Sequence, residues 1–262
     1  MDPSLRTAAT GMTAQQTRID VIANNLANVN TPGFKRSRAH FEDLLYQTIA
    51  GEQRVGGSAG DVTPAVQIGR GTRLAAVQRV HQQGAFEITG RPLDVAIDGE
   101  GLFQVRRPDG TTAYTRDGSF TISDQGVLVT SGGYAFVPEI SVPEDMSEVT
   151  ISRTGIVSAT GPGQAEPVEI GRVELARFPN LPGLIALGEN LYQESVASGQ
   201  PILGAAQEDG FGRIIQGALE ASNVEVVQEM VEMIAALRAY EINAKAVEAS
   251  EQMAETTNQM VR

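Results

Sequence analysis

The sequence contains no cysteine and no tryptophan, and aromatic residues make up 5% of its 262 positions. Without cysteine the chain can form no disulfide, bind no metal through thiolates and use no cysteine nucleophile. Basic residues are outnumbered by acidic ones, so the net charge is −12 and a general nucleic-acid-binding surface is not expected. These absences restrict the function to classes that need neither thiol chemistry nor a basic surface.

Long apolar runs are also missing. No stretch approaches the roughly 18 consecutive apolar residues that a membrane span requires, so we expect no membrane insertion. The first residues, MDPSLRTAATGM, lack the apolar core of a cleavable secretory signal. The sequence therefore predicts either a cytoplasmic protein or one that is exported without signal cleavage.

Motifs for catalysis or cofactor binding are absent as well. The histidines, His40 and His81, stand apart from any metal-spaced acidic cluster, and we interpret both as solvated. Asp-Gly pairs at 98–99, 109–110 and 117–118 are typical of turns rather than of a calcium loop. GFGRIIQG (210–217) matches neither the P-loop nor the dinucleotide fingerprint. The sequence predicts no enzyme activity, no catalytic residue, no cofactor and no metal site.

Each end of the chain carries an apolar heptad pattern that predicts a helix. The first pattern covers residues 5–29 and stops at Thr31-Pro32-Gly33, because proline disfavours helix in the residue before it. The second predicts a helix of about 40 residues, with Ser222 and Glu225 as a capping box at its start. The apolar positions of the two patterns are Leu5, Met12, Ile19, Ile22 and Leu26, and then Val226, Met230, Met233, Leu237, Tyr240, Ala244 and Val247.

The middle of the chain has a different pattern. Short apolar or alternating runs, punctuated by Asp-Gly and Gly-Gly, predict strands and hairpins of an antiparallel β domain. The predicted fold is therefore α+β, with coiled-coil-like N- and C-terminal helices enclosing an inserted, mainly antiparallel β domain. Residues 1–35 and 218–262 would form a terminal-helix domain, 36–70 an extended arm or linker, and 71–217 the β-rich domain.

The two helices differ in length, so about half of the second one would lack a partner within the chain. Its apolar face would then pack against neighbouring subunits. Alternatively, the C-terminal helix could fold back along the β domain, or the helices could form a soluble coiled-coil module that binds another protein. A β-domain hydrolase with helical appendages is a third hypothesis, and it would need a pair of carboxylates with perturbed pKa values in a pocket.

Six stretches follow one another along the chain: IANNLANVNTPGFKRSRAHFEDLLYQTI, DVAIDGEGLFQV, AYTRDGSF, GVLVTSGG, GENLYQESVASG and GALEASNVEVVQEMVEMIAALRAYEINAKAVE. They closely resemble blocks of the flagellar basal-body rod and hook protein family, in the order in which the family has them. They are most similar to the distal rod members of the family, with the proximal rod members as the alternative.

The resemblance implies a structural subunit that polymerises helically into a hollow, rigid drive shaft. That shaft would transmit torque from motor to hook and conduct exported subunits, with the terminal helices as the inner tube. The implied partners are further copies of the chain, proximal rod proteins, the hook protein, the P-ring and L-ring bushing proteins and the flagellar type III export apparatus. The implied location is the periplasm-spanning rod of the basal body.

Two groups of residues receive roles from this interpretation. Phe41 and Leu45 match a short pattern that rod-type substrates use at the export gate, although both could simply pack a helix or arm. Asparagines 24, 25 and 28 could bond to neighbouring helices or to backbone in a packed tube, or could merely weaken the helix end. Under the packed-tube interpretation, replacing Asn25 with leucine is expected to leave the monomer folded but to impair rod assembly. The polar interface and turn residues are Asn24, Asn25, Asn28, Thr31, Pro32, Gly33 and Phe34.

Overall fold

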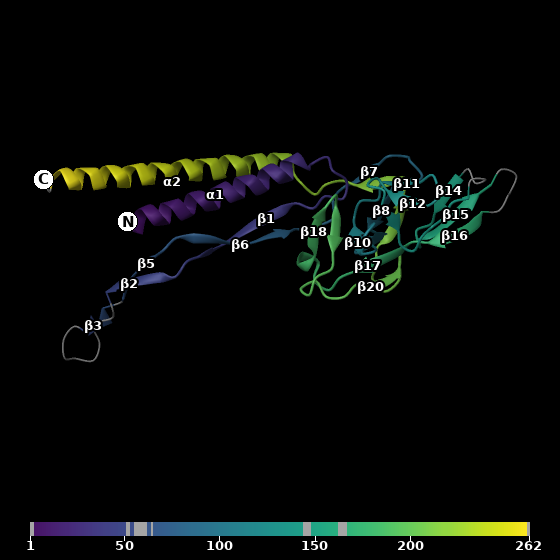
Figure 1. The fold of residues 1–262 in the computed structure, drawn as a ribbon, viewed down its shortest axis with the longest axis horizontal. Helices are drawn as coiled ribbons and strands as arrows, with labels where there is room; N and C mark the ends of the chain where they lie inside the picture. The colour runs from purple at the N-terminus through teal and green to yellow at the C-terminus, as the bar shows by residue number, and fades with distance from the viewer. Residues whose placement is uncertain are drawn as a thin grey trace. The chain divides into compact units, whose positions relative to one another are not determined.

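The computed structural model of the protein describes residues 3–50, 53–54, 62–63, 65–143, 148–161 and 167–260 (Figure 1). The chain divides into two compact units, and each of them is assembled from separate stretches of sequence. The first, here called the helical unit, comprises Met1–Leu26, Ser37–Gln78 and Glu225–Arg262. The second, here called the β unit, comprises Ala27–Arg36 and Arg79–Val224.

The helical unit contains the two predicted helices, α1 (Pro3–Ala27) and α2 (Val226–Met260), which lie side by side (Figure 1). They run antiparallel: Ser4 lies 3.5 Å from Ser250 between hydroxyl oxygens, and Arg18 lies 3.3 Å from Glu232. The prediction of terminal helices packed on each other is confirmed. The predicted capping box is wrong, because α2 begins at Val226 and not directly after Ser222.

An arm of paired strands follows α1 in the same unit. Strand β1 (Ser37–Asp43) pairs with β6 (Thr72–Arg79), and β2 (Tyr46–Ala50) pairs antiparallel with β5 (Val66–Gly69). Further out, β3 (Gln53–Arg54) pairs with β4 (Val62–Thr63). The glycine-rich part of the predicted arm at 51–52, 55–61 and 64 lies outside the described residues.

The β unit is built around one large antiparallel sheet. In it the neighbouring strands follow the order β11-β12-β13-β9-β10-β19-β18, and β17 joins β9 to β20. Smaller pairings, β8 with β21, β7 with β22 and the ladder β14-β15-β16, complete the unit. The strand bounds are β7 (Phe86–Ile88), β8 (Val95–Asp98), β9 (Leu102–Arg106), β10 (Thr112–Thr115), β11 (Phe120–Ile122), β12 (Leu128–Thr130), β13 (Ala135–Phe136), β14 (Glu148–Ile151), β15 (Ile156–Thr160), β16 (Val168–Arg172), β17 (Glu174–Arg177), β18 (Ile185–Gly188), β19 (Leu191–Gln193), β20 (Ile202–Ala205), β21 (Arg213–Gln216) and β22 (Ala218–Glu220), with a 3-10 turn η1 (Leu181–Gly183) before β18.

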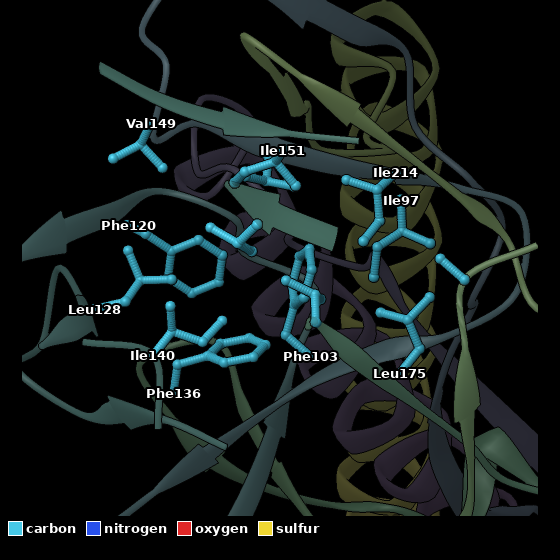
Figure 2. Close-up of a cluster of buried hydrophobic side chains, with 14 of the residues drawn as sticks. Ile97, Phe103, Phe120, Leu128, Phe136, Ile140, Val149, Ile151, Leu175 and Ile214 are labelled. Carbon is cyan, nitrogen blue, oxygen red and sulfur yellow. The ribbon is translucent and has the colours of Figure 1, made fainter. Parts of the chain in front are cut away.

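The core of the β unit centres on three phenylalanines (Figure 2). Phe103, Phe120 and Phe136 pack edge to face, with ring centroids 5.2 to 6.2 Å apart. Aliphatic side chains from β8, β14, β17 and β21 surround them, including Ile97 and Leu175 (Figure 2). Such ring pairs add to the large apolar area that each phenylalanine buries, so this cluster holds strands from distant parts of the sequence together.

Candidate functional site: the terminal helices and the loop after α1

Small residues line the contact between α1 and α2. Ala14 of α1 and Ala236 of α2 are buried, and a Cβ atom at Gly11 would lie 3.0 Å from Nδ2 of Asn243. Glycine at position 11 therefore makes room for the Asn243 side chain of α2 against the backbone of α1. Large side chains are consequently not needed to fill the contact, and most of those on α2 point elsewhere.

The predicted apolar residues of α1 lie at least partly inside the helical unit. Ile22 is buried, and Leu5, Met12, Ile19 and Leu26 are half-buried. On α2 the prediction divides into two groups. Met233, Ala244 and Val247 are half-buried, whereas Val226, Met230, Leu237 and Tyr240 are exposed to between 38% and 51%.

Helix α2 carries a second exposed apolar face, which the heptad pattern did not predict. Val227 is 77% exposed, Val231 61%, Ile234 52% and Ile242 68%. The signal was present, since VVQEMVEMIAALRAYEINAKAV places apolar residues at almost every angular position around the helix. A helix that is apolar on all sides is normally buried on all sides. The heptad interpretation considered one face and therefore left this one out.

Asn25 joins α1 to the first strand of the arm. Its side-chain Oδ1 accepts from the Ser37 backbone N–H at 2.8 Å, and its Nδ2 donates to the Ser37 carbonyl at 2.9 Å. The same Nδ2 also donates to Oε2 of Glu229 on α2 at 3.1 Å. Asn25 is fully buried, so leucine at this position would leave the backbone of Ser37 without these partners. We therefore expect the Asn25→Leu monomer to be less stable than the wild type.

The other predicted asparagines occupy different environments. Asn24 is exposed on α1, and Asn28 is half-buried after the helix end. The Asn28 Oδ1 atom accepts a hydrogen bond from the Thr31 hydroxyl at 3.2 Å, within the turn that ends the helix.

The Thr31-Pro32-Gly33-Phe34 loop docks inside the β unit. The Pro32 carbonyl accepts from Nδ2 of Asn190 at 3.0 Å, and the Gly33 N–H donates to the Glu220 carbonyl at 2.7 Å. Gly33 has φ +69°, and a Cβ there would lie 2.7 Å from the Asp117 nitrogen, so glycine is required for both reasons. Phe34 is buried, with the Arg79 guanidinium 6.0 Å from its ring centroid.

A buried ionic cluster, here called the Glu220 cluster, lies directly beside this loop. Glu220 is 1% exposed and accepts hydrogen bonds from the Lys35 ammonium and the Arg116 Nε, both at 2.5 Å, and from the Gly84 N–H at 2.9 Å. Lys35 also donates to the Gln82 carbonyl, and Arg116 donates to the carbonyls of residues 97, 99 and 101.

Lys35 and Glu220 stand 185 positions apart in the sequence. No local pattern connects them, so the cluster was not predicted.

The electrostatics of the Glu220 cluster are dominated by burial. Burial alone would raise the pKa of Glu220, but the charges of Arg116 and Lys35 and their hydrogen bonds bring that pKa below its ordinary value. Burial also lowers the pKa of Lys35, and attraction to Glu220 offsets part of this effect. The carboxylate is therefore held ionised between the two cations.

His81 lies against the same region and is half-buried. Burial, together with the charges of Lys35, Arg79 and Arg116, lowers the pKa of His81 to about 4. Its ring packs against that of Tyr192 at 5.7 Å between centroids. His81 is therefore less exposed than the interpretation as a solvated histidine implies, whereas His40 is exposed on β1 as expected.

The two export-gate candidates lie at the base of the arm. Phe41 is half-buried on β1, and Leu45, which follows the strand, is 84% exposed. Leu44 and Leu45 line a groove with Arg6, Thr10 and Arg70. Among the described residues there is no group of three acidic or histidine side chains that could hold a metal ion. None of the described helices is long and apolar enough to cross a membrane.

Comparison with known proteins agrees with the arrangement of helices and strands. Residues 5–35 match the flagella basal body rod protein family, 96–159 match the flagellar hook protein FlgE/F/G D1 domain, and 215–260 match the flagellar basal body rod FlgEFG protein C-terminal family. The flagellar basal-body rod protein FlgG of Borreliella burgdorferi is 50% identical over 99% of this chain and 98% of its own length. The chain belongs to the FlgG branch of the flagellar FlgE/F/G family.

Two further relatives show the range of the similarity. FlgG of Bacillus subtilis is 40% identical over 95% of this chain and 96% of its own length. The flagellar basal-body rod protein FlgF of Caulobacter vibrioides is 34% identical over 94% of this chain and 92% of its own length. Membership of the FlgG branch makes the chain a structural, non-enzymatic subunit of the flagellar basal-body rod.

Proposed function

We propose that this FlgG-branch protein forms the distal part of the rod by helical self-association into a hollow, rigid tube that transmits torque. The observation that carries the proposal is the exposed apolar circumference of α2. Val227, Val231 and Ile234 lie on one side, and Val226, Met230 and Leu237 lie on another. A single neighbouring helix cannot cover both sides, so several copies would have to surround each α2.

The energetic argument concerns the area that assembly would cover. A large apolar side chain contributes roughly 1.5–3 kcal/mol when it passes from full exposure to full burial. These side chains are between 41% and 77% exposed, so each retains a sizeable part of that amount for contacts with neighbours. Apolar patches of this extent mark association surfaces in soluble proteins. Self-association is thus favoured by burial of many side chains, each of which contributes a moderate free energy. A shaft under torque requires such a distribution over many contacts.

The wider set of partners follows from the position of the rod in the flagellum. We infer contacts with proximal rod proteins at one end and the hook protein at the other, and with the P-ring and L-ring bushing proteins around the shaft. Transit through the flagellar type III export apparatus would involve Phe41 and the exposed Leu45. The identity to FlgG relatives exceeds that to FlgF, which favours the distal over the proximal position.

The test places a charge on the exposed face of α2. Val231→Lys should leave the helical content of the monomer unchanged by circular dichroism, because the side chain already faces solvent. The variant should form no tubes in electron microscopy under conditions in which the wild type, seeded with rod fragments, does. Gln252→Lys, at another exposed position of α2 that lacks an apolar side chain, is the matched control and should assemble.

Normal tubes from Val231→Lys would show that this face is not an assembly surface. A wild type that stays monomeric when seeded, and instead binds a different protein through α2, would favour the coiled-coil binding module.

A further inference from the structure

The Glu220 cluster contains more positive than negative charge. Lys35 and Arg116 are each at least 94% buried, and Glu220 is the carboxylate that both contact. Buried charges in proteins are normally paired, because transfer of an unpaired ion from water is costly. One buried positive charge in this cluster therefore lacks a counter-ion within it.

The same two cations form part of the wall of a pocket of about 220 Å³. Glu220 does not line this pocket, so the cluster turns its positive side toward the opening. Leu102, Ala176 and Leu181 provide apolar wall. The pocket thus combines a cationic floor with apolar sides.

Both cations keep a donor hydrogen that the hydrogen bonds seen among the described residues do not use. The Lys35 ammonium has three hydrogens, and its acceptors are the Gln82 carbonyl and Glu220. The Arg116 guanidinium has five, and it uses four of them on Glu220 and on the carbonyls of residues 97, 99 and 101. His81, which also lines the pocket, is neutral at pH 7 because of its lowered pKa and carries one further N–H donor.

We propose that this pocket binds a carboxylate carried on a short aliphatic chain, with its oxygens on Lys35 and Arg116 and its carbon atoms against Leu102, Ala176 and Leu181. A free organic acid and an acidic side chain of a second copy of this chain present the same chemistry. The chain itself carries a net charge of −12, so acidic side chains are abundant on any neighbouring copy. The proposal does not depend on polymerisation.

The binding test uses propionate as the probe. It is titrated into the monomeric protein against sodium chloride at constant ionic strength, and the ring signals of His81 are followed by NMR. The site predicts a saturable shift with propionate and none with propionamide, which has a similar size and no charge. Equal shifts with both compounds, or no saturable shift, would overturn the proposal.

A pair of variants tests the affinity for propionate quantitatively and leaves the residues of the Glu220 cluster unchanged. Glu100 lines the pocket, its side chain is 67% exposed, and it lies 3.8 Å from Arg177. Glu100→Gln removes a carboxylate that repels the probe, so it should tighten propionate binding by about threefold to tenfold. Glu208→Gln, whose side chain is 64% exposed and pairs with Arg172 away from the pocket, should leave the affinity unchanged. Equal effects of the two variants would refute the placement of the site.

The source of the carboxylate is decided by a dilution series. If a second copy supplies it, the His81 signals move with protein concentration in the absence of propionate, and propionate reverses that movement. If they stay constant with concentration while propionate still shifts them, the natural occupant is a free organic acid.

Discussion

Replacement of Glu220 by glutamine should destabilise the β unit strongly. The carboxylate compensates two buried cations, and glutamine keeps its size while removing its charge. Two charge-assisted hydrogen bonds of roughly 1.5–3 kcal/mol each are affected, and the amide oxygen can still accept one of them at neutral strength. We therefore expect the free energy of unfolding to fall by about 3–5 kcal/mol, the range found when one partner of a buried ion pair is removed.

The measurement is urea unfolding at pH 7, followed by tyrosine fluorescence. Tryptophan is absent from the chain, and three of its five tyrosines, Tyr114, Tyr134 and Tyr192, lie in the β unit, so the tyrosine signal reports mainly on this unit. Glu208→Gln removes an exposed pair with Arg172 and should cost less than about 1 kcal/mol. A loss below about 1 kcal/mol for Glu220→Gln would refute the view that this carboxylate holds the cluster together.

A double-mutant cycle makes the same prediction sharper. Glu220→Gln alone leaves two buried cations without their carboxylate, whereas Glu220→Gln combined with Lys35→Met leaves one, so the costs of the two changes should not add. The pH dependence has a definite sign as well. Because the folded-state pKa of Glu220 lies below its ordinary value, its contribution is present above pH 4.5 and is lost as the pH falls through the lowered value.

Three further changes test other parts of the structure. Asn25→Ala should cost about 2–4 kcal/mol in urea unfolding, because it leaves buried backbone partners unsatisfied. Gly33→Ala should cost more than Gly110→Ala, since both need positive φ but a Cβ at Gly110 meets nothing within 4 Å; equal melting temperatures would contradict this. Between pH 6.5 and 4 the unfolded chain takes up a proton at His81 that the folded β unit resists. Stability should therefore decrease by up to roughly 3 kcal/mol as the pH falls through this window, and His81→Gln, unlike His40→Gln, should remove that part of the slope.

The elements that could be predicted from the sequence are those with a local signal. The heptads predict α1 and α2 because each helix repeats its environment every few residues, and the Asp-Gly pairs predict the turns because their backbone requirement is local. Alternating runs between these turns predict antiparallel strands for the same reason. The antiparallel β architecture and the paired terminal helices are accordingly confirmed.

The polar interactions of the structure could not be predicted, because no local sequence pattern indicates them. Lys35 reaches Glu220 across 185 positions, and Asn25 reaches Glu229 across 204, so only the folded chain brings these side chains together. The lowered pKa of His81 likewise depends on burial in the folded chain and, in part, on the charges of the distant Lys35 and Arg116. The exposed face formed by Val227 and Val231 is a different case, because the apolar composition of α2 did contain a signal for it. The heptad pattern describes one face of the helix and therefore did not predict this one.

The small-residue contact between α1 and α2 has a consequence for how a shaft could grow. Because Gly11, Ala14 and Ala236 are small, the large aliphatic side chains of α2 are not used within the chain. An incoming subunit therefore arrives with these side chains still exposed. A single encounter in solution covers one side of α2 and leaves the others wet, whereas the end of an existing tube covers several sides at once. Elongation would then be favoured over nucleation, and free subunits would stay apart until a template presents itself.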